Sequence, residues 1–546
     1  MSHHFPRSPL RGTTPHLARL AALLLVLVLG CFPGLSVQAG APLAPFVLDP
    51  ALPTDVVVNP GQGLGQCHWV EVSVLSQPVA SWGYDATETN SSWAVLEPRP
   101  GEFDWSPLDA QVHKASDLEK RIWLELLTTE GQTPSWARDA GVRLIGSRGG
   151  TPVPWDPAYQ ALLRRAVHAM AARYDDDPTV DAVNLMAGGC YGEMAICARE
   201  TDTALWEQVG YTDDLFISAV KQIIDIYLED EYTWPDGTTT HGFRHTPVVL
   251  QLGGGLYGHT AAVIQPVVAY AMETYGMRVW LKYNGLGGSF DMQWLFDKYS
   301  DVTRVGYEPA GTTPEFDQNP EQYVMAALKQ HSSFLCLQKR YFALSDPGWS
   351  RARDLAARYL GSQILLQVEA PQRAAAGDKL VVNMQWVNRG TVPLMRPLRQ
   401  GRADVPASYD IWLGLVDPAS GTVVAASSFT PAPPTTRWYS AQKIALEGHL
   451  AIPSSLQSGT YELRVGLLNP DLPRDSPERY FRLVDGASSD EAGRYQAGSL
   501  QVTEAVPAVS ATPAVTPVPP SPPVPQENAL VRLVRALLDW LKHLFR

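Results

Sequence analysis

The sequence lacks the residue patterns of a metal centre and of a nucleotide-binding loop. It contains five cysteines and 12 histidines in 546 residues, but neither a Cys-x-x-Cys pair nor a cluster of histidines accompanies them. The Gly-rich turns at 253–255 and 285–288 are without the Lys-Ser/Thr of a phosphate-binding loop and without the full dinucleotide spacing. We therefore expect neither a metal nor a cofactor.

The sequence also has fewer positively than negatively charged residues. The 43 Lys and Arg residues are outnumbered by 56 Asp and Glu residues, which gives a formal net charge of −13. A chain of this sign repels nucleic acid, so we expect no nucleic-acid partner. The 16 Trp and 21 Tyr residues suit a carbohydrate partner, because aromatic faces stack on sugars, although most such rings fill the core.

The N-terminus has no apolar run of confident membrane-spanning length. Its apolar run covers only residues 20–29, which is short for a transmembrane helix. Arginines precede this run and a small-residue cleavage pattern ends at Ala39, as in a secretory signal peptide over residues 1–39. We expect a secreted or extracytoplasmic protein, including one associated with the cell envelope. Cleavage before Cys31, as in a lipoprotein, is the alternative.

Residues 58–362 alternate strand and helix signals. A helix is expected over 157–174, where Asp156 is the N-cap and apolar residues recur at helical spacing. Eight strands are expected, at 62–73, 82–93, 121–128, 180–186, 247–252, 278–283, 303–307 and 333–338. Eight strands with helical crossovers over this length predict a (β/α)8 TIM barrel, an α/β fold.

After this region the sequence pattern changes from alternating strands and helices to short strands alone. Residues 364–505 contain short strands separated by Pro, Gly and Asn turns and show no helical period, which predicts an all-β sandwich domain. Its strands are expected at 365–370, 379–387, 409–416, 422–428, 461–467 and 480–484. Residues 506–527 are rich in Pro, Ala, Val and Ser and predict a Pro-rich linker without a core.

Residues 528–546 are expected to form a C-terminal amphipathic helix. Leucines, Trp540 and Phe545 fall on one face, and four of the five charged residues on the opposite face are Arg or Lys. Such a helix binds an anionic membrane surface or a partner groove. The alternative is that it docks on its own protein or self-associates, since periodicity does not say what an apolar stripe faces.

Four cysteines follow the expected signal peptide. Outside the cytoplasm they can form two disulfides, and four cysteines allow three pairings. Cys190 and Cys197 bracket Glu193 on one loop, which makes them a plausible pair. Cys67 and Cys336 then lie near the first and last strands, which are neighbours in a closed barrel.

Two glutamates stand at expected strand ends. Glu193 follows the fourth strand in Gly-Gly-Cys-Tyr-Gly-Glu, and Glu308 ends the seventh in Val-Gly-Tyr-Glu-Pro. Strand ends of a (β/α)8 barrel converge on one face, and two carboxyl groups meeting there can break a glycosidic bond. The structural alternative is that both glutamates form ordinary salt bridges at loop starts.

Three features carry a family resemblance. The first is the run Trp93-x-x-Leu96-Glu97-Pro98-x-x-Gly101-x-Phe103-Asp104-Trp105, and the second is Tyr174-Asp175 followed by Asp177-Pro178 and then Gly192-Glu193. The third is a barrel followed directly by a sandwich. Over about residues 58–505 the chain resembles secreted glycosidase-like barrels distantly related to bacterial β-galactosidases and to other members of glycoside hydrolase clan A. The resemblance implies that Glu193 is the acid/base, that Glu308 is the nucleophile, and that Tyr283 hydrogen-bonds the nucleophile.

The chain departs from the family pattern at two places. Gly192 stands where many relatives have an asparagine that binds the sugar 2-hydroxyl. The eighth strand leads into Lys339-Arg340 instead of carrying a platform tryptophan. These departures put the substrate and the activity itself in question.

The predicted function is a secreted, retaining glycoside hydrolase that acts on a carbohydrate substrate with two glutamates. Five further residues are candidates for substrate binding, with Trp93 able to serve either as a sugar platform or as packing: Tyr283, Asn284, Trp93, Tyr191 and Glu130. The alternative function is a non-catalytic carbohydrate-binding or cell-envelope protein on a degenerate glycosidase barrel.

Overall fold

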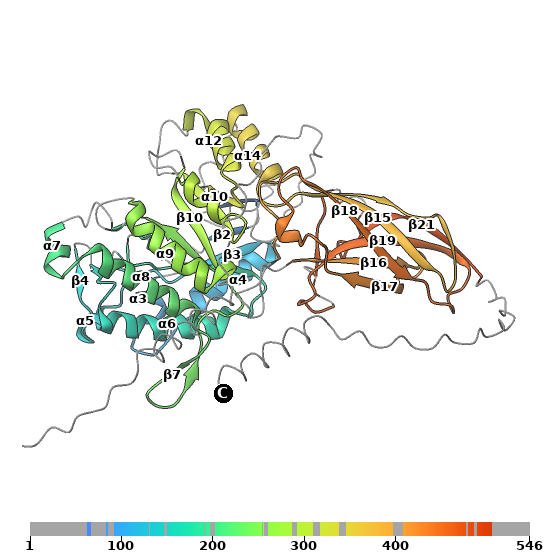
Figure 1. Cartoon of the computed structure of the whole chain (residues 1–546). Helices are drawn as coiled ribbons and strands as arrows, with labels where there is room; N and C mark the ends of the chain where they lie inside the picture. The colour runs from blue at the N-terminus through green and yellow to red at the C-terminus, as the bar shows by residue number, and fades with distance from the viewer. Residues whose placement is uncertain are drawn as a thin grey trace, which may run out of the picture. The chain divides into compact units, whose positions relative to one another are not determined.

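Figure 1 shows a computed structural model of the chain, which describes residues 63–66, 83–85 and most of 92–504. The gaps within 92–504 are 119, 130, 147–149, 190–191, 197–202, 254, 256–259, 287–291, 310–316, 338–345, 397–407, 475, 477–478 and 485–488. The expected signal peptide, linker and C-terminal helix lie outside the described residues. So do Glu130, Tyr191, Lys339 and Arg340, and every cysteine except Cys336.

Eight parallel strands close into a barrel, which confirms the predicted fold class. Their bounds are β1 (Gly63–Gln66), β2 (Gly83–Asp85), β3 (Arg121–Glu125), β6 (Val180–Leu185), β9 (Val248–Leu252), β10 (Val279–Leu286), β11 (Val305–Pro309) and β12 (Phe334–Leu337). The barrel closes because β1 pairs with β12, with Gly65 opposite Cys336. The fourth and seventh strands along the chain are therefore β6 and β11.

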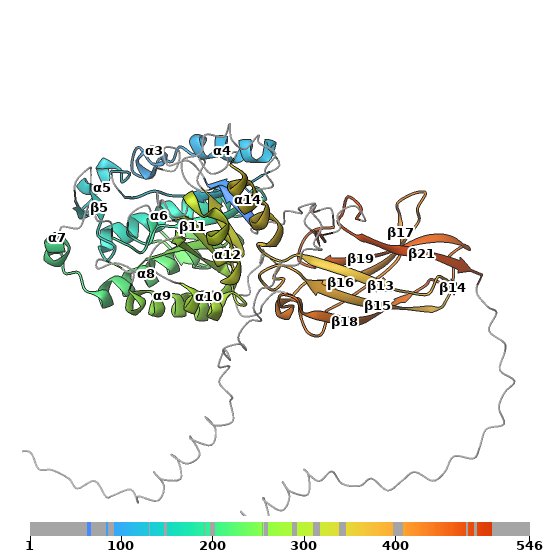
Figure 2. The ribbon, with the colours of Figure 1, turned by 90° about the horizontal axis from the view of Figure 1, so that it is seen from above.

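Helices surround these strands in two perpendicular views (Figures 1 and 2). The helices are α3 (Trp93–Leu96), α4 (Ser106–Asp117), α5 (Ser135–Asp139), α6 (Pro157–Tyr174), α7 (Thr203–Gln208), α8 (Asp213–Leu228), α9 (Ala261–Thr274), α10 (Gln293–Tyr299), α12 (Pro320–Lys329) and α14 (Pro347–Tyr359). The helix expected over 157–174 is confirmed as α6, and the Asp156 side chain accepts from Ala158 N. The second expected strand is wrong at its end, because Trp93 begins α3 instead.

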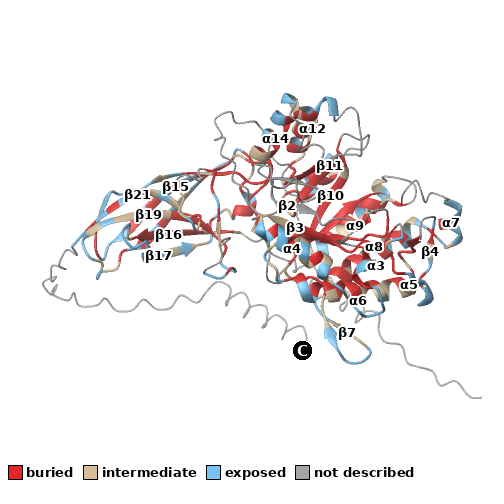
Figure 3. Cartoon of the chain, turned by 180° about the vertical axis from the view of Figure 1, so that it is seen from behind, coloured by how far each residue is buried: buried red, intermediate tan, exposed pale blue. Residues whose placement is uncertain are grey.

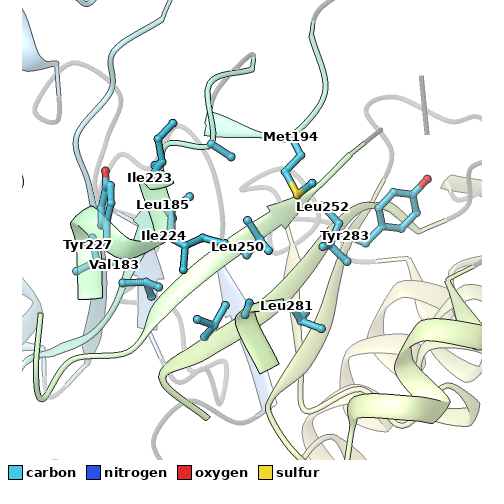
Figure 4. Close-up of a cluster of buried hydrophobic side chains, with 14 of the residues drawn as sticks. Val183, Leu185, Met194, Ile223, Ile224, Tyr227, Leu250, Leu252, Leu281 and Tyr283 are labelled. Atoms are coloured by element: carbon cyan, nitrogen blue, oxygen red, sulfur yellow. The ribbon is translucent and has the colours of Figure 1, made fainter. Parts of the chain in front are cut away.

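The barrel strands whose burial is described, from β3 to β12 along the chain, are buried on both faces (Figure 3). One set of alternate residues packs outward against the helices, as Leu250 and Leu281 do beside Ile224 of α8 (Figure 4). The other set forms a separate inner cluster of Trp123, Ala182, Val249, Trp280, Phe334 and Cys336. Trp123 contacts the rings of both Trp280 and Phe334, which belong to strands that are not its neighbours, so these side chains meet inside the barrel.

Residues beyond the barrel form two facing sheets around one apolar core, in which the strands pair antiparallel except for the parallel pair of β14 and β21. The first sheet contains β13 (Ile364–Glu369), β15 (Lys379–Asn388) and β18 (Lys443–Ala451). The second contains β14 (Arg373–Ala375), β21 (Tyr495–Thr503), β19 (Gly459–Leu468), β16 (Asp410–Val416) and β17 (Val423–Phe429), with β20 (Tyr480–Phe481) paired to β19. This all-β region was predicted, although β14, β18 and β21 were not.

Hydrogen bonds join the last barrel segments to the start of the all-β region. Thr391 Oγ1 donates to the carbonyl of Ser332, and the Thr391 carbonyl lies 3.0 Å from Nδ1 of His331. The Thr391 amide donates to the carbonyl of Gly361 at 2.8 Å. No helix in the described parts of the chain has the length and apolarity needed to cross a membrane.

One disulfide involves a cysteine of β12, the last barrel strand, which pairs with the first strand β1. Cys336 of β12 is disulfide-bonded, and its partner must be one of the cysteines outside the described residues. Cys67 directly follows β1, which pairs with β12, so the topology favours Cys67 as that partner. The pairings of Cys67 and of Cys190 with Cys197 stay predictions.

Candidate active site

Polar side chains replace the inner apolar layer toward the carboxyl ends of five barrel strands. Side chains of a strand alternate between its two faces, so a residue two or four positions beyond an inward-facing one also faces inward. Five of the polar residues follow an inner-cluster residue of their own strand in this way, Asn284 by four positions and the others by two. The sixth, Glu308, is the register partner of Asn284. The residues are Glu125 of β3, Asn184 of β6, Gln251 of β9, Lys282 and Asn284 of β10, and Glu308 of β11. The carboxyl end of such strands is the functional face of a (β/α)8 barrel.

Glu193 approaches this layer from the loop after β6. Its carboxylate Oε1 accepts a hydrogen bond of 2.7 Å from Nδ2 of Asn284. The backbone next to it is fixed to β9, because the Met194 amide donates to the Gln251 carbonyl at 2.9 Å. Glu193 itself is half-buried, so the loop presents one carboxyl group at the edge of the polar layer.

Glu308 lies in the same layer, beside Asn284. The two residues are register partners on β10 and β11, and adjacent strands are about 4.8 Å apart. The Glu308 side chain is 4% exposed, and its Oε2 lies 3.3 Å from Nζ of Lys282, whose side chain is 0% exposed. Asn284 therefore stands between the two candidate glutamates and contacts Glu193 directly.

Tyr283 lies on the other face of β10. It belongs to the outer apolar cluster, at whose edge Figure 4 shows it, and its ring meets that of Tyr307 edge-on at 6.1 Å. Burial, and then the charge of Glu193, raise the pKa of the Tyr283 phenol to about 12. On β10, Glu308 thus has Asn284 as its register partner and Lys282 as an ion-pair partner, and the charge of Glu193 acts on Tyr283. The expected hydrogen bond from Tyr283 to Glu308 stays a prediction.

Glu125 adds a third carboxyl group to the polar layer. Asn184 Nδ2 donates to its Oε2 at 3.3 Å, and the two residues are register partners on β3 and β6. Burial, with a smaller contribution from the Glu125 charge, raises the pKa of Tyr227 on the outer side of β6 well above its ordinary value. Glu125 is 8% exposed, so it lies deeper than Glu193.

The departure at Gly192 has a steric cause. Its φ of +83° lies in the left-handed region, and a Cβ there would meet Met186 Cε at 2.3 Å and Met186 Sδ at 2.9 Å. The same Cβ would lie 3.2 Å from Nε2 of Gln251. An asparagine at position 192 therefore needs both a left-handed backbone conformation and a shift of the Met186 side chain.

Trp93 lies in the core. It is 0% exposed, and its indole Nε1 donates to Oε2 of Glu97 at 2.7 Å. Glu97 in turn accepts from the Gly101 amide and forms an ion pair with Arg165. A fully buried indole offers no face to a sugar, so the interpretation of Trp93 as a platform is corrected to packing.

The structure adds four residues that the sequence analysis did not select: Glu125, Asn184, Gln251 and Lys282. Their signal was present, since each is a polar residue inside or at the end of an otherwise apolar strand. Such residues are costly to bury without partners. Among the described residues, no three His, Cys, Asp or Glu side chains gather as a metal site.

Residues 83–201 match the sequence model of glycoside hydrolase family 42, described as β-galactosidase. This stretch runs from β2 through β6 and past Glu193. None of the curated proteins matches the chain.

Solved structures give weaker likenesses. The catalytic domain of a β-amylase from Paenibacillus polymyxa is 10% identical, with a TM-score of 0.38 over 54% of this chain and 97% of that one. A β-galactosidase from the psychrophilic Marinomonas ef1 is 18% identical, with a TM-score of 0.25 over 47% of this chain and 42% of that one. The CARDB domain of a Pyrococcus furiosus protein is 8% identical, with a TM-score of 0.15 over 26% of this chain and 96% of that one.

The chain thus spans less than half the length of the Marinomonas β-galactosidase. The expected resemblance to β-galactosidase-like barrels of glycoside hydrolase clan A is confirmed over residues 83–201 by the family match.

Proposed function

We propose that the protein is a secreted or extracytoplasmic glycoside hydrolase that retains anomeric configuration, with Glu308 as nucleophile and Glu193 as acid/base. The observation that carries the proposal is the placement of Asn284, which is hydrogen-bonded to Glu193 and paired in register with Glu308. Two carboxyl groups gathered at the carboxyl ends of barrel strands are the equipment of this reaction.

The chemistry needs both groups in sequence. The Glu308 carboxylate attacks the anomeric carbon while Glu193 gives its proton to the departing oxygen, which leaves a glycosyl ester on Glu308. Glu193 then takes a proton from water, and the hydroxide attacks the same carbon. The sugar leaves with its original configuration, and both glutamates return to their starting states.

A carbohydrate is the substrate in this proposal. The family description that matches residues 83–201 is β-galactosidase, so aryl β-galactosides come first in a substrate screen. Aryl glucosides, xylosides and uronides follow, together with polysaccharides. The secretory signal peptide expected over residues 1–39 is the feature that supports a reaction outside the cytoplasm.

The test compares wild type with Glu308→Gln and Glu193→Gln. We expect Glu193→Gln to lower kcat by about 10²–10⁴-fold for poor leaving groups, and Glu308→Gln to lose turnover. Glu102→Gln is the matched control, because that side chain is 64% exposed and pairs only at the surface with Arg99. NMR of the first product anomer decides between retention and inversion, and inversion would contradict the assignment of Glu308 as nucleophile.

A non-catalytic carbohydrate-binding protein is the second candidate. The observation that favours it is the burial of Glu308 against Lys282, with both side chains almost unexposed. This candidate predicts that no glycoside in the screen is hydrolysed and that oligosaccharides still bind, as calorimetry would measure. Equal oligosaccharide affinity of wild type and Glu308→Gln would support it further.

A further inference from the structure

The buried ion pair between Lys282 and Glu308 is the least expected feature of the barrel interior. Its atoms Nζ and Oε2 are 3.3 Å apart, and the two side chains are 0% and 4% exposed. Removing two charges from water costs several kcal/mol for each ion, which their attraction offsets only in good geometry. A buried lysine in this position is therefore unusual unless its charge has a use.

Stability alone does not account for the pair. Replacing a buried ion pair by apolar residues of similar volume is often neutral or stabilising. The barrel already fills its interior in that way one level lower, where Trp280 of the same strand meets Trp123 and Arg304 covers its ring. An apolar residue at position 282 would continue that layer.

The charged groups around the pair come from several elements. Glu125 faces the interior from β3, where Asn184 of β6 binds it. Gln251 of β9, in register with Lys282, and Asn284 of β10 are neutral amides. Glu193 enters from the loop after β6, and the described residues of β12 supply only the disulfide-bonded Cys336 as a potentially titratable side chain. Among these described neighbours, Lys282 supplies the positive charge, and its Nζ lies 3.3 Å from Oε2 of Glu308.

The two candidate catalytic carboxyl groups, Glu308 and Glu193, therefore have different electrostatic environments. Glu308 lies against an ammonium, which favours the ionised carboxylate. Glu193 instead accepts a hydrogen bond at Oε1 from the neutral side-chain amide of Asn284. A retaining reaction needs this asymmetry, since the nucleophile must be charged while the acid is protonated.

We propose that Lys282 is a positioning residue whose buried ammonium holds Glu308 as a fixed, ionised carboxylate and so selects it, and not Glu193, as the nucleophile. The role given to Glu308 rests on the proposed function. The statement that Lys282 holds Glu308 ionised stands on the ion pair alone and is testable without any substrate.

The first experiment measures thermal unfolding of the full chain from pH 7 to pH 3.5. Wild type is compared with the double variant Lys282→Met/Glu308→Gln, which removes both charges together and is the variant expected to fold. A carboxylate held ionised in the folded state stabilises at neutral pH and loses this contribution as the pH falls. We expect the difference in Tm between wild type and double variant to change by about 2 °C or more across this range, and a constant difference would overturn the proposal.

The second experiment uses Lys282→Met and Lys282→Arg with a hydrolysed glycoside. We expect Lys282→Met to move the acid limb of the kcat/KM profile upward by about one pH unit, and Lys282→Arg, which keeps the charge, to restore it in part. Lys329→Met, at an exposed lysine of α12, is the matched control. An unmoved acid limb in Lys282→Met would overturn the proposal.

The two experiments separate the two ideas. If wild type hydrolyses nothing, the proposed function fails, and the unfolding profile still decides whether Lys282 holds Glu308 ionised. If glycosides are hydrolysed but the unfolding difference is independent of pH, the reaction stands and the role of Lys282 is refuted.

Discussion

The side-chain amide of Asn284 donates to the carboxylate of Glu193 at 2.7 Å, across the mouth of the barrel. Asn284 belongs to β10, and Glu193 to the loop after β6, with β9 between those strands. The hydrogen bond therefore ties together elements that are 91 residues apart in the chain.

Replacing Asn284 by alanine removes this contact. Glu193 is protonated when it acts as the acid, and a hydrogen bond between neutral groups contributes about 0.5–1.5 kcal/mol. We therefore expect kcat/KM for a hydrolysed glycoside to fall by roughly 2- to 13-fold. Asn383→Ala, on the exposed face of β15, should leave the same constant unchanged. A loss below twofold in Asn284→Ala would mean that the contact has no part in the reaction.

The order and number of the barrel strands followed from the sequence, because continuous apolar runs such as Val248–Leu252 are typical of parallel strands buried on both faces. The same counting placed Glu193 after the fourth strand and Glu308 in the seventh. The strand β18 was missed although Ile444, Leu446 and Leu450 alternate in it. Its polar exposed face and Gly448 diluted the strand signal.

The partners of the candidate glutamates did not follow from the sequence. Lys282 and Tyr283 are adjacent, and a shift of one residue exchanges the inner and outer faces of a strand. Only the register of β10 with its neighbours shows that Lys282 faces the interior and Tyr283 the helices. Likewise, the exclusion of a side chain at Gly192 depends on Met186, which the spacing of residues does not reveal.

Gly192 should resist substitution for two separable reasons. Gly192→Asn introduces both an unfavourable φ and a clash with Met186, whereas Gly210→Ala, at φ +88° with nothing within 4 Å, introduces only the first. We expect the Gly192 variant to lose about 2–5 kcal/mol of unfolding free energy and the Gly210 variant about 1 kcal/mol. Denaturant melts measure both values, and equal losses would show that Met186 moves aside.

Glu97 should stabilise the barrel far more than Glu102. The Glu97 side chain is 0% exposed and binds Arg165, Trp93 and the Gly101 amide. Its removal leaves the half-buried guanidinium of Arg165 and the buried indole of Trp93 without this acceptor, so we expect Glu97→Ala to cost about 3–5 kcal/mol of unfolding free energy. Glu102→Ala breaks an exposed pair with Arg99 and should cost about 0–1 kcal/mol. Similar values for the two variants would contradict this account.

Asp301 should lower stability at neutral pH. Burial raises the pKa of its carboxyl group, while a backbone hydrogen bond and the charge of Arg437 oppose the shift. The folded state then holds the proton more tightly than the unfolded state, so the penalty is present at neutral pH and disappears in acid. We expect Asp301→Asn to raise Tm at pH 7 and to have no effect near about pH 3. The exposed Asp297→Asn is the control, and a gain that is independent of pH would refute this mechanism.

The amphipathic segment 528–546 should bind anionic membrane surfaces. In a helix, its leucines, Trp540 and Phe545 share one face, and the opposite face carries four Arg or Lys residues against one Asp. Each cation near an anionic surface contributes about 1 kcal/mol at low salt, and the apolar face adds the burial of its side chains. We expect full-length protein to co-sediment with anionic liposomes and to be released in part by high salt, whereas a chain ending at residue 527 should stay in the supernatant.

Full-length protein with Leu537→Asp and Leu541→Asp should also stay in the supernatant, because these changes break the apolar stripe and keep the four cations. Equal sedimentation of all three proteins, or none with anionic liposomes, would favour docking of the segment on its own protein.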